Sequence, residues 1–407
     1  MVRALPCKGV FGHDFAVVFA VPKPEIYNTE KLNFMNILFS AFINPERKSG
    51  VDKKIYGQIK AFERLGHNVW YFTFKDGKIL LHNREKCEVL FSVSANTVGY
   101  YMALQKGMRH VCTNIPVDMV YIRHIFCTPF HLKTLRMFKN KGIATVEEIP
   151  TYPYDELNKH FTSPFYRIAS IVDKATRSGY KGCLDYFTTY SKDSTIFGVP
   201  CINLDNGVDF DTLRFIPTEF PEDRIDMIAV SAMSPCHGYE RAIEGIANYM
   251  EKGGSMPVHL HLVGDGPERK NWEQLTDRLD LREYVHFHGH CLGQELIDVF
   301  DRCQIGLSIL SMYKMGMEAV SPLKTREYAA MGKPFIYAND ELNIDENTPF
   351  CMRVANDATP LDIEKIAEFY NRVKSTPDIC HVLHDFAKQH YSWDAQMKLV
   401  TELAANK

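Results

Sequence analysis

The stretch LVGDGPE at residues 262–268 is followed by VHFHGH at 285–290 and by SPLKTREYAAMGKPFIYAN at 321–339. Each of the three reads as the end of a strand, a tight glycine turn and the start of a helix. In open α/β sheets such places bind anionic ligands, because unpaired backbone N–H groups and the helix dipole point at the phosphates. The sequence between Leu262 and Asn339 therefore predicts a parallel sheet with a phosphate-binding edge.

Apolar runs of strand length alternate with helix-period segments over most of the chain, which is typical of parallel α/β architecture. The expected strands lie at 35–42, 68–74, 118–124, 143–149, 185–191, 201–207, 224–233, 258–264, 284–289, 304–310 and 334–338. From about residue 361 onward, four segments read as helical. The chain breaks into two halves near 210–222, where two prolines and several acidic residues follow a glycine.

The 407 residues are enough for two domains of ordinary size. We expect an N-terminal extension (1–34), a first Rossmann-like domain that binds the acceptor (35–212), a second that binds the donor (213–390), and a C-terminal helix (391–407) packing back toward the first domain. The extension is either an extra strand or hairpin, or an upstream extension of the reading frame.

Composition narrows the class of protein. A formal net charge of −3 gives no support for nucleic-acid binding as the main function. The eleven cysteines are scattered from Cys7 to Cys380 without a CxxC pair, which favours reduced thiols in the cytoplasm over a disulfide framework. No apolar run approaches the roughly 20 residues that a membrane-spanning helix needs.

The motifs resemble, in their order and spacing, those of glycosyltransferase family 4 (group 1). The first half is similar too, in SGVDKKIYGQIKAFERLGHNV at 49–69, EIPTYPYDE at 148–156 and NGVD at 206–209. The resemblance covers roughly residues 35–400. It implies the GT-B architecture, in which two Rossmann-like, doubly wound parallel-sheet domains face each other across a cleft. It also implies a retaining sugar transfer from a nucleoside diphosphate to a hydroxyl, with neither cofactor nor metal.

The helix expected to begin at Pro322 and Leu323 is the predicted donor site. In the family, the glutamate that matches Glu327 is thought to accept both ribose hydroxyls, while the N–H groups before it hold the diphosphate. Lys324 would neutralise the charge that grows on the departing diphosphate. The alternatives are an ordinary first-turn glutamate favoured by the helix dipole and a solvated lysine.

Two features depart from the family pattern. The family usually has a second glutamate, and the matching place here is Ala319, with Glu318 as the nearest acid. Members also carry an arginine and a lysine in the turn that reads VSAMSPCHGYER here, where Ala232 and His237 stand instead. His237 could still donate to a phosphate, and Arg241 lies one helical turn further on.

Other residues complete the predicted donor site. The resemblance places these beside the donor phosphates or the base: Gly50, Gly264, Gly266, His288, Gly289 and His290. The glycines are equally explained as good tight turns. Zinc binding by the histidines is disfavoured, since no cysteine pair or helical HxxxH accompanies them. Asp209 and Asp211 read as a turn cap rather than a metal site.

Acceptor contacts are expected in the first half. Two prolines and two tyrosines follow a strand in EIPTYPYDE, which suits stacking on a sugar ring, although aromatic loops also serve as structural plugs. The candidates are Tyr152, Tyr154, Asp155 and His124.

These expectations give one predicted function and two alternatives. The predicted enzyme transfers a hexose-like sugar, from UDP in preference to GDP, to a glycan or lipid-linked glycan in bacterial surface polysaccharide synthesis. Basic residues in 47–54 and 133–141 could rest on an anionic inner leaflet or be an ordinary solvated surface. The alternatives are a nucleotide-sugar epimerase of the same architecture and a catalytically silent nucleotide-sugar-binding subunit of a polysaccharide assembly.

Overall fold

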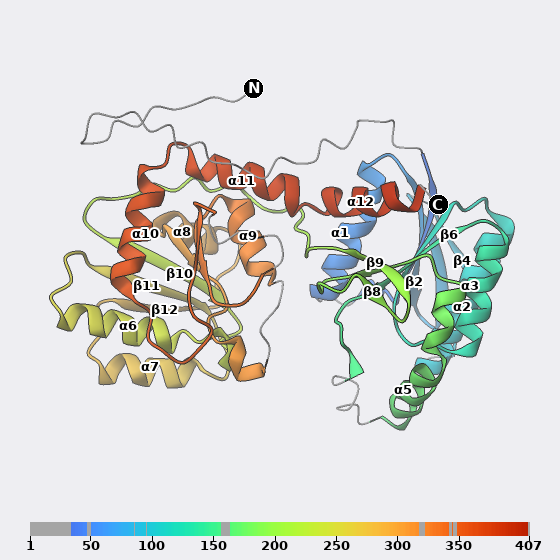
Figure 1. Cartoon of the computed structure of the whole chain (residues 1–407), viewed down its shortest axis with the longest axis horizontal. Coiled ribbons are helices and arrows are strands. Elements are labelled where there is room, and N and C mark those ends of the chain that lie inside the picture. The colour runs from blue at the N-terminus through green and yellow to red at the C-terminus, as the bar shows by residue number, and fades with distance from the viewer. Residues whose placement is uncertain are drawn as a thin grey trace. The chain divides into compact units, whose positions relative to one another are not determined.

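The structure, a computed structural model, describes residues 34–46, 50–84, 86–94, 96–155, 163–316, 322–341, 344 and 348–405. The extension expected over 1–34 therefore lies, apart from Phe34, outside the described residues. The described chain contains two separate sheets with helices packed on them (Figure 1).

The first sheet has a parallel centre with antiparallel strands at both edges. Its strand order is β4-β3-β2-β1-β5-β6-β7-β9-β8, and the pairs β2–β3, β3–β4 and β8–β9 are antiparallel. The strands are β1 (Asn36–Ser40), β2 (Asn68–Lys75), β3 (Lys78–Asn83), β4 (Lys86–Ser92), β5 (Met119–Arg123), β6 (Ala144–Ile149), β7 (Tyr186–Thr189), β8 (Thr195–Ile196) and β9 (Val199–Asn203).

Helices pack on this sheet and begin at recognisable caps. They are α1 (Gly50–Arg64), α2 (Thr97–Asn114), α3 (Pro129–Asn140), α5 (Pro164–Thr176) and the 3₁₀ helix η1 (Arg177–Gly182). The side chain of Thr128 caps α3 by accepting from the His131 N–H, and Pro129 occupies the first turn, where its missing N–H costs nothing.

The second sheet is entirely parallel and has the strand order β12-β11-β10-β13-β14-β15. Its strands are β10 (Ile225–Ser231), β11 (Val258–Gly264), β12 (Val285–Gly289), β13 (Ile305–Leu307), β14 (Phe335–Tyr337) and β15 (Cys351–Arg353). The chain winds in opposite directions from β10, and ligands of such sheets bind at the carboxyl ends of the strands beside that point.

The helices of the second half close both faces of this sheet and then return to the first. They are η2 (Pro235–His237), α6 (Glu240–Glu251), α7 (Arg269–Arg278), α8 (Gln294–Arg302), η3 (Met312–Met315), α9 (Leu323–Met331), α10 (Ile363–Ser375), α11 (Ile379–His390) and α12 (Trp393–Ala405). The final helix α12 lies beside α1 (Figure 1). Its buried side chains, Trp393, Met397, Val400 and Ala404, belong to the core of the first sheet.

The α/β fold expected from the sequence, two Rossmann-like parallel-sheet domains, is confirmed. Each of the eleven expected strands coincides with a strand of the structure. The prediction for the C-terminal stretch was wrong in one respect, because its described residues form three helices from 363 to 405 and not four. The β3–β4 hairpin was not expected. Among the described residues, no helix has both the length and the apolarity to cross a bilayer.

Candidate functional site

Two loops pack tightly at the carboxyl end of the second sheet. A Cβ atom on Gly264 would lie 1.9 Å from the carbonyl oxygen of Ser231, and one on Gly266 would lie 2.0 Å from that of Ala232. No other residue fits at these two positions, because real Cβ atoms do not approach a carbonyl oxygen so closely. The two glycines of the GDGP turn therefore allow the loop after β11 to pack closely against the loop after β10.

Helix α9 begins beside these loops, as the sequence predicted. Pro322 is its N-cap residue with an extended backbone, and Gly332 ends it in the left-handed conformation at φ 78°. Pro322 is buried and Leu323 is exposed. Glu318 lies outside the described residues.

Lys324 and Glu327 lie one turn apart on α9, and both are half-buried. The Nζ of Lys324 donates to the carbonyl oxygen of Val230, at the end of β10, over 2.6 Å. Burial lowers the pKa of Lys324 to about 8, against the opposing effect of Glu327. Burial likewise raises the pKa of Glu327, although the charges of Lys53 and Lys324 oppose the rise. Both side chains therefore lie where water solvates their charged forms poorly.

Glu327 forms part of the wall of a pocket of about 230 Å³. The pocket is lined by α1, by the segment that follows β9, by α9 and by α12, through Lys53, Lys54, Gly207, Val208, Asp209, Thr212, Leu213, Leu323, Glu327 and Trp393. No hydrogen bond joins the carboxylate of Glu327 to any described residue. A half-buried carboxylate without such a partner, facing a pocket, is an acceptor ready for a ligand donor.

His237 is buried at the end of η2 and is neutral at pH 7. Burial, and then the charge of Lys324, lower its pKa to about 4. Its Nδ1 lies 2.9 Å from the backbone nitrogen and 3.2 Å from the carbonyl oxygen of Ser234. His237 therefore brings no positive charge to the surroundings of Lys324.

Arg241 is fully committed to the interior of the second domain. Its Nε donates to the carbonyl oxygen of Thr359 at 2.6 Å, its Nη1 donates to that of Leu310, and its Nη2 lies 3.5 Å from Asp357. The guanidinium fixes the loops after β13 and β15. The structure thus gives the guanidinium of Arg241 structural partners on all of its nitrogens.

The histidines at the end of β12 belong to a ladder of imidazoles. The Nε2 of His288 lies 3.0 Å from the Nδ1 of His261, whose Nε2 lies 3.1 Å from Asp226. Burial, and then the charges of His261 and Arg302, lower the pKa of His288. Gly289 turns the chain at φ 69°, and His290 is exposed. No group of three or more histidine, cysteine or acidic side chains is placed to hold a metal ion in the described parts of the chain.

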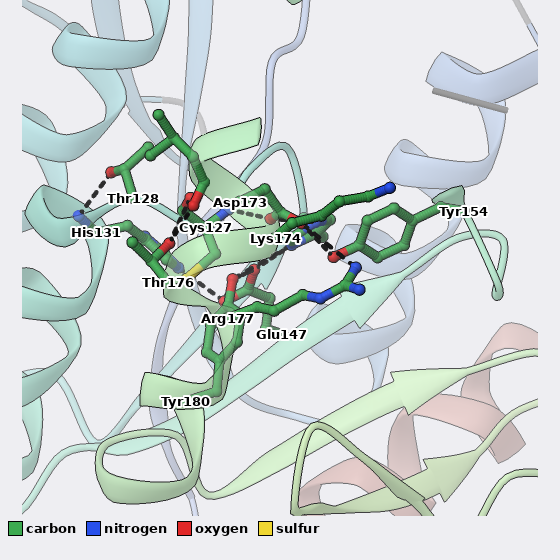
Figure 2. A network of polar contacts seen from close by, with 12 residues as sticks. Cys127, Thr128, His131, Glu147, Tyr154, Asp173, Lys174, Thr176, Arg177 and Tyr180 are labelled. Atoms are coloured by element: carbon green, nitrogen blue, oxygen red, sulfur yellow. Dashed lines mark hydrogen bonds and ion pairs between the residues drawn. The ribbon is translucent and has the colours of Figure 1, made fainter. Parts of the chain in front are cut away.

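The four acceptor candidates come together in the first domain, but most of their polar atoms are used there. Figure 2 shows Tyr154 with Asp173 and Arg177. The hydroxyl of Tyr154 donates to Asp173 at 2.9 Å, and both carboxylate oxygens of Asp155 accept from Arg177 at 3.0 Å. His124 packs on Tyr154 with ring centroids 5.1 Å apart. Tyr152 keeps a half-exposed ring 6.4 Å from that of Tyr154.

Glu147 lies at the centre of this first-domain network, which we call the Glu147 network. It accepts from the ring nitrogens of His124 (2.6 Å) and His131 (2.8 Å) and from the hydroxyl of Tyr180 (2.8 Å). Burial alone would raise the pKa of Glu147, but its bonds and charge interactions with the two histidines hold it well below the usual range. The carboxylate is saturated by protein groups.

The sequence did not lead us to predict a second buried carboxylate, Glu148, or the lysine that pairs with it, Lys54. Glu148, next along β6, pairs with Arg123 at 2.9 Å and with Lys54 at 3.3 Å. Lys54 also donates to Asn206 and lies 3.5 Å from the centre of the Tyr190 ring. Two adjacent acids inside an apolar strand were the available signal, since buried carboxylates require partners.

The buried ion network around Arg326 was also missed. Arg326 donates to both oxygens of Asp205, at 3.0 and 2.7 Å, and pairs with Glu341. Asp205 follows β9, so this network connects α9 to the segment that lines the pocket. Gly50, by contrast, begins α1, where a helix start was expected.

Comparisons with known proteins agree with this geometry. Residues 224–359 match a family model described as glycosyl transferases group 1. No curated protein sequence is significantly similar to the chain. Among solved structures, a glycosyltransferase from Rickettsia africae ESF-5 is 14% identical with a TM-score of 0.59, over 92% of this chain and 98% of that one.

Two further structures have the same fold. Anabaena Alr3699/HepE, solved in complex with UDP, is 15% identical with a TM-score of 0.55, over 92% of this chain and 100% of its own. The lipopolysaccharide outer core galactosyltransferase WaaB is 13% identical with a TM-score of 0.55, over 91% of this chain and 99% of its own. The chain therefore has the GT-B fold, and its residues 224–359 match the group 1 glycosyltransferases.

Proposed function

We propose that the protein is a retaining, metal-independent glycosyltransferase. It would move a sugar from a nucleoside diphosphate, UDP in preference to GDP, to a hydroxyl of a glycan or lipid-linked glycan in bacterial surface polysaccharide synthesis. The observation that carries this proposal is the half-buried carboxylate of Glu327, which lines the pocket one turn into α9 and has no hydrogen-bond partner among the described residues. The complexes of Alr3699/HepE with UDP support the choice of nucleotide.

The proposed donor lies with its ribose hydroxyls on Glu327 and its diphosphate at the start of α9. Unpaired N–H groups there, at the positive end of the helix dipole, suit a phosphate. Lys324 faces the same place and would stabilise negative charge on the leaving diphosphate, since an ammonium held out of water acts strongly on a charge that develops beside it. Neutral His237 would add one N–H donor.

The proposed acceptor lies on the first domain beside the accessible ring of Tyr152. Tyr154, Asp155 and His124 would act indirectly, by fixing the loop that carries this ring. Membrane contact is proposed at the exposed side chains of Lys133 and Arg136 on α3. Two other basic residues of that helix region, Lys139 and Lys141, donate to the carbonyl oxygens of Gly182 and Cys112.

Calorimetry against UDP-, GDP- and ADP-sugars tests the donor site. We expect micromolar to millimolar binding of a UDP-sugar, and Glu327→Ala should abolish it while the protein stays folded. Wild-type affinity in that variant would contradict the site. Turnover then separates the activities: a transferase liberates UDP only with acceptor present, an epimerase interconverts sugars without one, and a silent subunit binds donor but turns over with no member of an acceptor panel.

A further inference from the structure

The proposed donor brings a diphosphate with at least two negative charges to α9, so the positive charges around the pocket can be compared one by one. In the second domain, His237 is neutral and Arg241 is committed to Thr359, Leu310 and Asp357. The amine of Lys324 already donates a hydrogen bond to the carbonyl oxygen of Val230. One partly engaged lysine is a small charge for a diphosphate that must be held out of water.

The first domain brings two lysines to the same pocket, and they differ sharply. Lys54 is bound to Glu148 and Asn206 and stacks on Tyr190. Lys53, its neighbour in the first turn of α1, is exposed and lines the same pocket as Glu327. No hydrogen bond or ion pair joins Lys53 to any residue that the structure describes.

A diphosphate attached to a ribose at Glu327 must lie within a few ångströms of that ribose. A lysine carries its charge on a flexible four-carbon stem, so a lysine that lines the pocket of Glu327 can turn its amine toward a diphosphate held there. The charge of Lys53 is already felt at the Glu327 carboxylate.

We propose that Lys53 is the cation which the first domain contributes to the donor diphosphate, in the pocket that it lines together with Glu327. This inference rests on the proposed function. It makes Lys53 a donor-binding residue that recognises phosphate charge, not the nucleoside. It also makes tight binding depend on residues of both domains, because Glu327 comes from the second.

The test compares Lys53→Ala with Lys60→Ala, an exposed lysine two turns further along α1 that does not line the pocket. Calorimetry at low ionic strength measures UDP and UMP directly and uridine by competition with UDP. A charge-assisted contact that is partly open to solvent is worth about tenfold in affinity. We therefore expect Lys53→Ala to weaken UDP about tenfold and UMP less, and to leave uridine within about twofold of wild type.

Lys53→Arg should keep most of the UDP affinity, and Lys60→Ala should match wild type. The inference is overturned if Lys53→Ala binds UDP as tightly as Lys60→Ala does, or if it weakens UDP and UMP by the same factor. The proposed function fails separately: UDP, GDP and ADP would then all fail to bind the wild-type protein, or Glu327→Ala would bind UDP normally.

Discussion

Glu327 in the second domain and Glu147 in the first are both carboxylates drawn out of water, but their surroundings are opposite. Glu147 accepts from two histidines and a tyrosine, and its pKa lies well below the usual range. Glu327 faces a pocket with no hydrogen-bond partner among the described residues, and burial raises its pKa. The protein itself stabilises the ionised form of Glu147, whereas the ionised form of Glu327 awaits stabilisation by a ligand. Partners already present distinguish a structural carboxylate from a binding one.

The largest effect on stability is expected from a substitution of Arg326, which precedes Glu327 on α9. Like Glu147, and unlike Glu327, Arg326 already has protein partners for its charge. Arg326→Met removes the guanidinium that binds the buried carboxylates of Asp205 and Glu341. Removing one partner of a buried ion network should lower the free energy of unfolding by about 4 kcal/mol. Denaturant titration measures this loss, and Arg282→Met, at an exposed ion pair with Asp277, serves as the control with little or no loss. Equal losses in the two variants would show that the Arg326 network is not a distinct stabilising feature.

Glu147→Gln should come next, with a loss of about 3 kcal/mol, because the amide that replaces one oxygen presents a donor to groups that already donate. The pKa of Glu147 is depressed from 4.5, so its ionised form stabilises the folded state above about pH 4.5, and this contribution declines as the pH falls below that value. The stability difference between wild type and variant should therefore shrink below about pH 4.5. A stability difference between wild type and variant that stays constant from pH 7 to pH 3 would contradict the view that protein groups stabilise the ionised form of Glu147.

Lys324 should give the smallest effect, visible in pH dependence. Its pKa is lowered to about 8, so the amine is charged at pH 7 and loses its charge as the pH rises through 8. Affinity for UDP should therefore fall about fivefold between pH 7 and pH 9, an amount expected for one half-screened charge. Lys324→Met should bind UDP weakly and should lose this decline. The same decline in the variant would assign it to another group.

The sequence foretold those parts of the fold that depend on local pattern. Strand-length apolar runs, the proline and glycine that bound α9, and the glycines of the GDGP turn were all visible in it. The β3–β4 hairpin could have been expected as well. Asp76 and Gly77, both with positive φ, form the two-residue Asp-Gly turn that joins β2 to β3, and this pair is a strong hairpin signal.

The partners of the charged side chains could not be predicted from the sequence, since they come from distant parts of the chain. Arg326 meets Asp205 from 121 positions away, and no local pattern in the sequence identifies that partner. Likewise, Lys53 and Lys54 look alike in the sequence, and only the three-dimensional positions of Glu148 and Asn206 show that Lys54 is occupied.

The central claim is that Glu327 is a carboxylate reserved for a donor nucleotide, and calorimetry of UDP on Glu327→Gln tests it most directly, with unfolding measured on the same samples. The account predicts at least about a hundredfold loss of UDP affinity, because the ribose hydroxyls lose a charged acceptor. Stability at pH 7 should be unchanged or higher, since a raised carboxyl pKa means that ionisation opposes folding. Unchanged UDP affinity together with a stability loss like that of Glu147→Gln would contradict the account, because Glu327 would then be a structural residue.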